Sequence, residues 1–73
     1  MRLELRTERR GYLLTLEQDL FGDFVLLRHW YGLQNKRSGI KKQIFLTEES
    51  ARREFERVRK LRARRGYHPS GRE

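Results

Sequence analysis

The sequence predicts an α+β fold: a small antiparallel β-sheet of about four strands in a meander, with one C-terminal α-helix packed across one face. Three observations support this prediction. Apolar and polar residues alternate in several short runs. Turn residues separate these runs closely enough for antiparallel neighbours. The long stretch with helical spacing comes after the last of them. We expect one domain over residues 1–67 and a flexible C-terminal tail over residues 68–73.

The first two strands follow from this alternation. Leu3 and Leu5 alternate with charged residues, as in a short half-buried strand. A charged turn leads to a second strand with one apolar face, formed by Tyr12, Leu14 and Leu16. The sequence Asp-Leu-Phe-Gly at residues 19–22 indicates a turn, and we expect Leu20 and Phe21 to cover the end of the core.

Residues 24–31 form the longest predicted strand. Both of its faces are largely apolar, so we expect a central strand that is covered on both sides at its start. A loop over residues 32–39 returns the chain to a fourth strand over residues 40–46. The short connections make neighbouring strands antiparallel.

Thr47 is expected to begin the helix. Its hydroxyl suits an N-cap, and Glu48 and Glu49 place negative charge at the positive end of the helix dipole. The helix is expected to run to about Arg65, with Gly66 as a left-handed C-terminal cap. At about 100° per residue, one apolar stripe faces the sheet. Its members are Ala51, Phe55, Val58 and Leu61.

The chain is strongly basic. Eighteen Lys and Arg residues against ten Asp and Glu residues give a net charge of +8. Such a domain attracts polyanions and gains affinity by releasing their counterions. A stripe of cations lies opposite the apolar face of the helix and consists of Arg53, Arg57, Lys60 and Arg64. It suits contacts with phosphates that carry no sequence information. The alternative is a solvated face whose charges pair along the helix.

Trp30, the only tryptophan, ends an apolar run and precedes a basic loop. A large aromatic side chain beside positive charge suits stacking on a base or sugar while phosphates are held nearby. Arg28 lies on the same strand face and can add a phosphate contact, and Tyr31 can stack on a base. The basic patch around the loop is formed by Lys36, Arg37, Lys41 and Lys42.

Each of these aromatic and basic residues also has a structural interpretation. Trp30 can pack against the helix instead of a ligand. Arg28 can be an edge charge bonded to an acidic neighbour, and Tyr31 can lean on the sheet. The histidines, His29 and His68, have no partners at the spacing of a metal site or a catalytic triad, so we expect ordinary surface residues.

Several function classes are disfavoured by what the sequence lacks. It has no cysteine, so no disulfide and no thiolate zinc site. It has no glycine-rich phosphate loop, no nucleophile elbow and no cluster of acids and histidines, so we expect no enzyme, no cofactor, no metal and no small-molecule substrate. No stretch approaches the roughly 20 apolar residues of a membrane span, and the N-terminus lacks an apolar signal segment. We therefore expect a soluble cytoplasmic protein without a membrane partner.

A series of segments is spaced along the chain as in a known family: Asp19-Leu20-Phe21-Gly22, Arg28-His29-Trp30-Tyr31-Gly32, the Thr-Glu-Glu helix start and Arg65-Gly66-Tyr67. On these segments, residues 10–67 resemble a WGR domain, in the form of the short bacterial stand-alone members. The family is named for a Trp-Gly-Arg motif. The resemblance implies a small antiparallel sheet with a helix packed across it. It also implies DNA binding, with Trp30 packing on the sugar of a terminal nucleotide.

The motif itself is degenerate in this chain. Members usually read Trp-Gly-Arg-Ile-Gly, whereas residues 30–34 read Trp-Tyr-Gly-Leu-Gln. Aligned without a gap, Gly32 takes the Arg position, and if Tyr31 is an insertion, Leu33 does. The motif Arg is missing either way, and Lys36 or Arg37 can supply the charge.

The sequence thus predicts a small basic nucleic-acid-binding module. It would bind a DNA backbone or strand end through a surface of Trp, Arg and Lys side chains. The alternative is a protein-interaction adaptor with no direct nucleic-acid role.

Overall fold

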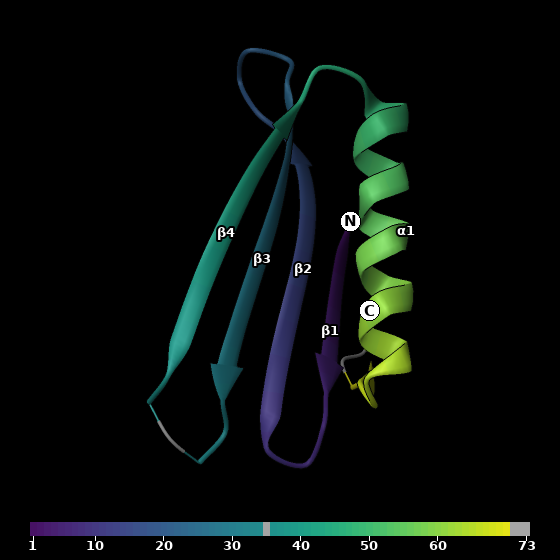
Figure 1. The fold of residues 1–73 in the computed structure, drawn as a ribbon. Helices are drawn as coiled ribbons and strands as arrows, with labels where there is room; N and C mark the ends of the chain where they lie inside the picture. Colours follow the sequence, from purple (N-terminus) through teal and green to yellow (C-terminus); the bar gives the residue numbers. More distant parts are fainter. Residues whose placement is uncertain (35, 71–73) are drawn as a thin grey trace.

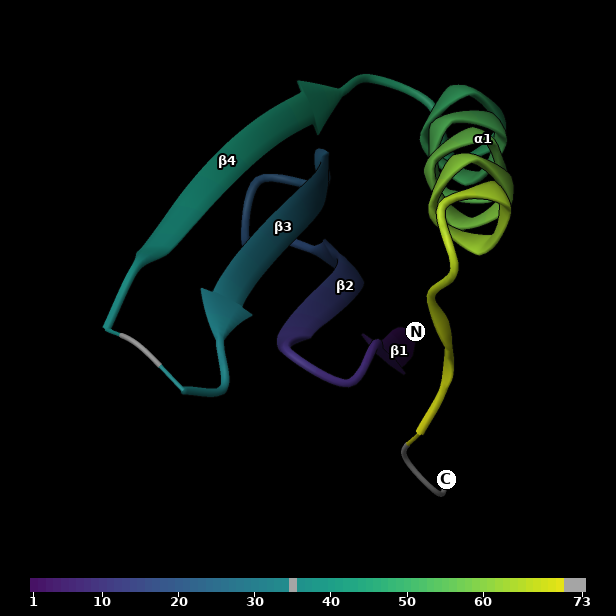
Figure 2. The same ribbon diagram turned by 60° about the horizontal axis from the view of Figure 1, so that its bottom comes forward.

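The computed structural model of the protein describes residues 1–34 and 36–70. In chain order the elements are β1 (Arg2–Arg6), β2 (Arg10–Gln18), β3 (Phe24–Gly32), β4 (Ser38–Phe45), α1 (Glu48–Arg64) and β5 (His68–Pro69). The strands form one antiparallel sheet in the order β4-β3-β2-β1-β5. The sheet curves around α1, which covers one of its faces (Figures 1 and 2). The predicted α+β architecture is confirmed.

The fifth strand, β5, is an element that the sequence did not predict. The helix ends at Arg64 with Arg65 as its C-cap, and Gly66 follows with a φ of +93°, a left-handed conformation that favours glycine. The chain then reverses, and His68 and Pro69 pair with β1. The sheet therefore continues past residue 67, where the domain was expected to end. Of the expected tail, residues 71–73 lie outside the described residues.

The hydrophobic core lies between α1 and the covered face of the sheet. Its buried members are Leu5, Tyr12, Leu14, Leu16, Leu26, Ala51, Phe55, Val58 and Tyr67. Strand alternation and helical periodicity predicted most of this set. Leu61 was expected to face the sheet with the others of its stripe, and it is half-buried.

The turn between β2 and β3 differs from its prediction. Leu20 is 100% exposed and Phe21 is 90% exposed, so the expectation that they cover the core is wrong. The Asp19 carboxylate accepts hydrogen bonds from two backbone amides of the turn, at 2.9 and 3.0 Å, and this holds the turn out into solvent. Phe24 and Phe45, paired across β3 and β4, pack on the core instead.

The two ends of the molecule carry different elements. The β2–β3 turn and the connection from β4 to α1 lie at the end drawn uppermost in Figure 1. The β1–β2 turn and the C-terminal end of α1 lie at the other end, together with the last residues of β3. No helix in the described part of the chain is long and apolar enough to cross a membrane.

Helix α1 begins as predicted at Thr47, whose hydroxyl accepts a hydrogen bond from the Ser50 amide at 3.2 Å. We expect Thr47→Ala to lower the free energy of unfolding by about 1 kcal/mol, because an amide of the first turn loses its acceptor. Thr47→Ser keeps the acceptor and should remain close to wild type. Urea denaturation of both variants checks this, and equal losses in the two would contradict the capping role.

Candidate nucleic-acid interface

A cleft of about 550 Å³ opens at the end of the molecule that holds the β1–β2 turn and the C-terminal end of α1. We call it the Trp30 cleft. Its lining includes four arginines and three aromatic residues, namely Arg9, Arg10, Arg37, Arg62, Trp30, Tyr31 and Tyr67. No acidic residue is among the described residues that line it. The cleft therefore combines positively charged lining with aromatic surface, the chemistry that suits a nucleotide.

Trp30 lies on the covered face of the sheet with about 40% of its surface exposed. The Tyr12 ring lies beside it on β2, with the ring centroids 6.3 Å apart and the planes 20° from parallel. On the other side, Gly39 of β4 is its cross-strand partner. A Cβ atom on Gly39 would lie 2.5 Å from the indole, so the absence of a side chain there lets the ring lie over the β4 backbone. The Trp30 ring is thus packed against Tyr12 and the β4 backbone, as in the edge-packing alternative, and its remaining surface faces solvent.

Arg62 comes from the last turns of α1. Its guanidinium carbon lies 4.3 Å from the centroid of the Tyr12 ring and 5.8 Å from that of Tyr67, as in a cation–π contact. Its Nε is buried and has no hydrogen-bond partner among the described residues. The two rings thus hold the charge of Arg62 at the cleft without neutralising it.

Arg9 is the last residue of the β1–β2 turn, and Arg10 is the first residue of β2. The Thr7 hydroxyl accepts hydrogen bonds from both of their amides, at 3.2 and 3.0 Å. The Leu33 amide donates to the Arg9 carbonyl at 2.9 Å, which ties this turn to the start of the β3–β4 loop. Both arginine side chains are exposed, and neither forms an ion pair with a described residue. The turn is fixed while its charged side chains stay available.

Arg9, Arg10 and Arg62 were not predicted as site residues from the sequence. Arg9 and Arg10 belong to a stretch that the sequence indicated only as a charged turn. The antiparallel register of β2 and β3 places Arg10 opposite Gly32, the last residue of β3. Arg62 follows Val58 by four residues and Phe55 by seven, so it continues the buried stripe of the helix, where it is half-buried, and it lies opposite the cationic stripe. A search for cations beside the C-terminal helix cap and beside the strand end after Trp30 would have found all three.

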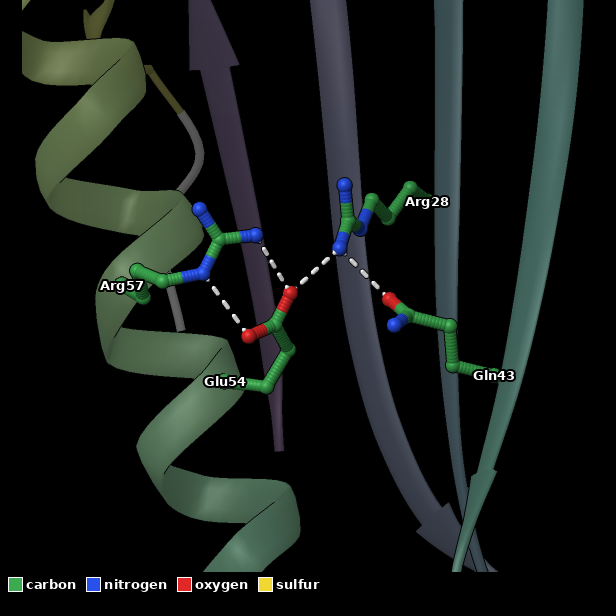
Figure 3. A network of polar contacts seen from close by, with 4 residues as sticks. All are labelled: Arg28, Gln43, Glu54 and Arg57. Atoms are coloured by element: carbon green, nitrogen blue, oxygen red, sulfur yellow. Dashed lines mark hydrogen bonds and ion pairs between the residues drawn. The ribbon is translucent and has the colours of Figure 1, made fainter.

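Arg28 has a different environment from the one a phosphate contact requires. Its Nη2 donates to Glu54 at 2.6 Å and to Gln43 at 2.5 Å (Figure 3). Arg57 also donates two hydrogen bonds to Glu54, at 2.8 and 2.6 Å. The side chains of Arg28 and Glu54 are only 11% and 17% exposed. The structure therefore favours the second predicted role of Arg28, a charge bonded to an acidic neighbour.

This network changes the titration of Glu54. The hydrogen bond from Arg57 lowers the pKa of Glu54 most, and the charges of Arg57 and Arg28 lower it further against the opposing effect of burial. Glu54 is thus held ionised between β3 and α1, where it couples the helix to the sheet.

Tyr31 also has a structural partner. Its ring packs against Gly11 of β2, and its hydroxyl donates to Glu4 at 2.9 Å. Burial raises the pKa of the Tyr31 hydroxyl, and the hydrogen bond to Glu4 raises it further. The residue lines the Trp30 cleft, but its polar end is engaged across the sheet. The structure therefore favours the packing role that the sequence left open.

The structure distributes the other predicted site residues over several surfaces. Arg37 lines the Trp30 cleft, whereas Lys36 is exposed and is not part of the lining. Lys41 pairs with Arg28 and shares its face, two residues along β4 from Gly39, and Lys42 alternates to the uncovered face. The cationic stripe of α1 is exposed, as predicted. Arg53 and Arg57 of that stripe form ion pairs along the helix with Glu49 and Glu54, and the other two members are Lys60 and Arg64.

Comparison with known proteins gives one match. The model of the WGR domain family matches residues 4–73. Neither a curated protein nor a solved structure matches the chain.

Proposed function

We propose that this chain, which belongs to the WGR domain family, binds strand ends or the backbone of DNA in the Trp30 cleft. The match covers nearly the whole chain and confirms the resemblance predicted from the sequence. The family is one of nucleic-acid-binding modules. The single observation that supports the proposal most is the partly exposed Trp30 ring in a cleft with four arginines and no acid among its described lining residues.

The dimensions and chemistry of the cleft suit a nucleotide. Its volume of about 550 Å³ lies in the range of sites that hold one small ligand. A sugar or base would contact the exposed part of the Trp30 ring. Guanidinium groups would hold the phosphates, since their planar donors match phosphate oxygens. Contacts of this kind do not read base sequence, so we expect little sequence preference.

In this proposal, arginines from other parts of the fold replace the missing motif Arg. At the two positions that align with the motif Arg stand Gly32, the last residue of β3, and Leu33. Arg37 lines the cleft from the far end of the same loop, and Arg9, Arg10 and Arg62 add charge from two other elements. We propose that these arginines together supply the positive charge of the missing motif Arg and hold phosphates beside Trp30.

The proposed role is binding without catalysis or a bound cofactor. The described lining of the Trp30 cleft consists of arginines, aromatic residues, glycines and Ser38, and it includes no carboxylate, thiol or imidazole that would serve as a general acid or base. A cytoplasmic location and a bacterial source stay predictions.

Titration of fluorescently labelled duplex, nicked duplex and single strands at low salt tests the proposal. We expect dissociation constants in the micromolar range that rise steeply with salt, because phosphate contacts release counterions. The absence of any binding at low salt would contradict the proposed function.

Gly39→Ala tests how the Trp30 ring is held. A methyl group at Gly39 would collide with the indole at 2.5 Å, so the ring must leave its place over β4. We expect affinity for labelled DNA to fall severalfold although the tryptophan is still present. Ile40→Ala, on the uncovered face of the same strand and 68% exposed, should leave affinity unchanged. Equal affinities in the two variants would show that the position of the ring does not matter.

The second candidate function, a protein-interaction adaptor, is favoured by a different surface. Ile40 and Ile44 are 68% and 58% exposed on β4, which is the edge strand of the sheet. An exposed apolar edge strand suits pairing with another chain. A partner that stays bound after nuclease treatment, and is lost in Ile40→Lys, would support this function over DNA binding.

A further inference from the structure

A second cleft, of about 670 Å³, adjoins the Trp30 cleft on the side of β5. We call it the Arg65 cleft. It shares four lining residues with the Trp30 cleft, namely Arg9, Arg10, Arg62 and Tyr67. Because these residues line both, the two clefts adjoin each other at the C-terminal end of α1, and we call the pair the groove.

The Arg65 cleft adds charge to this groove. Arg65 is the C-cap residue of α1, and its side chain lies in the lining together with that of His68. Arg65 is exposed and forms no ion pair with a described residue. The only acid in the described lining is Glu8. The positive surface therefore extends away from Trp30, from the three arginines that line both clefts to Arg65.

The backbone around this groove is fixed before any ligand binds. The Tyr67 amide donates to the Arg62 carbonyl at 3.1 Å and the Gly66 amide to the Ala63 carbonyl at 3.2 Å, which closes the end of the helix. The buried Tyr67 ring packs edge-on against Tyr12, with centroids 5.9 Å apart. Aromatic packing therefore connects the shared wall of the groove to Tyr12, which lies beside Trp30.

We propose that the groove binds a single-stranded extension at a DNA end, with one nucleotide at Trp30 and the following phosphates crossing to Arg65. This inference rests on the proposed function. Each cleft has the volume of a site for one small ligand, so the pair fits consecutive nucleotides of one strand. A positively charged groove beside an aromatic platform is the usual form of a single-strand site.

The test compares labelled duplexes that are blunt or carry a four-nucleotide thymidine extension, either 5′ or 3′, in anisotropy titrations at low salt. We expect one of the two extended duplexes to bind about tenfold more tightly than the blunt one. Arg65→Gln should remove most of that advantage while leaving blunt-end affinity unchanged. It should also reduce the salt dependence for the extended duplex by about 0.7 per lost phosphate contact.

Arg64→Gln is the matched control. It removes the same charge from the adjacent residue, which is exposed and does not line either cleft. It should leave the preference for the extended duplex intact. Circular dichroism confirms that both variants fold.

Three outcomes would overturn the inference, and they do so in two different ways. Equal affinity for blunt and extended duplexes, or equal effects of Arg65→Gln and Arg64→Gln, would overturn the extended groove and leave the Trp30 cleft as the site. Failure of wild-type protein to bind any of these DNAs would overturn the proposed function together with the inference.

Discussion

Trp30→Ala is expected to weaken binding of labelled DNA by about 1–3 kcal/mol, which corresponds to roughly a 5- to 150-fold rise in the dissociation constant. The substitution removes the exposed ring from the Trp30 cleft but leaves the four arginines of its lining in place. Salt dependence should therefore change little, because the phosphate contacts remain. Anisotropy titrations at several salt concentrations measure both quantities.

Two controls separate stacking from folding in this experiment. Trp30→Phe keeps an aromatic face and should lose only part of the affinity. Tyr31→Phe changes the other aromatic side chain of the motif region, whose hydroxyl is bonded to Glu4, and should leave affinity within about twofold of wild type. If Trp30→Ala binds DNA as wild type does, the ring is no ligand contact.

Glu54→Leu is expected to lower the free energy of unfolding by about 3 kcal/mol, the lower end for breaking a buried ion pair, because Gln43 still accepts from the stranded Arg28. Arg28 would be left 89% buried without its carboxylate. In a domain of this size the melting temperature should fall by roughly 12–24 °C. Thermal denaturation followed by circular dichroism measures the change.

The double variant Arg28→Met, Glu54→Leu tests the cause of that loss. Replacing both charges by apolar groups removes the stranded cation, so the double variant should be more stable than Glu54→Leu alone. If the double variant is no more stable than Glu54→Leu, the pair does not act as described.

The ion pair also predicts how stability depends on pH. Arg57 and Arg28 lower the pKa of Glu54 in the folded state. The stabilisation is therefore complete above the unfolded pKa of about 4.3 and is lost as the pH falls through the lower, folded pKa. The deficit of Glu54→Leu should accordingly be largest near neutral pH and shrink below about pH 4.

Local signals in the sequence were enough for most of the fold. Alternation placed Leu14 and Leu16 on the buried face, and helical spacing did the same for Phe55 and Val58. The N-cap at Thr47 was visible because capping depends on neighbouring residues only. These elements form because each has one apolar face, and each such face is readable from a few consecutive residues.

Long-range contacts account for what the sequence did not show. Alternation placed Arg28 and Trp30 on one face, but it does not reveal that α1 brings Glu54 over Arg28 and leaves Trp30 partly exposed. The pairing of β5 with β1 depends on where the chain points after Gly66.

The cleft itself is also a product of tertiary structure. The β1–β2 turn, the β3–β4 loop and the end of α1 are far apart in sequence, and each contributes an arginine to one opening. The net charge predicted a polyanion partner. The position of the binding site, however, depends on which cations the fold brings together. The two cations that the sequence proposed as substitutes for the motif Arg differ in this respect, since Arg37 lines the cleft and Lys36 does not.

Because Trp30 is the only tryptophan, its intrinsic fluorescence reports directly on the central claim that the Trp30 cleft is where DNA binds. Titration of wild-type protein with a short oligonucleotide at low salt should quench or shift this fluorescence. The change should follow the same binding curve as the anisotropy of the labelled DNA and reverse on adding salt. A full anisotropy curve with unchanged Trp30 fluorescence would place the DNA elsewhere and contradict the account.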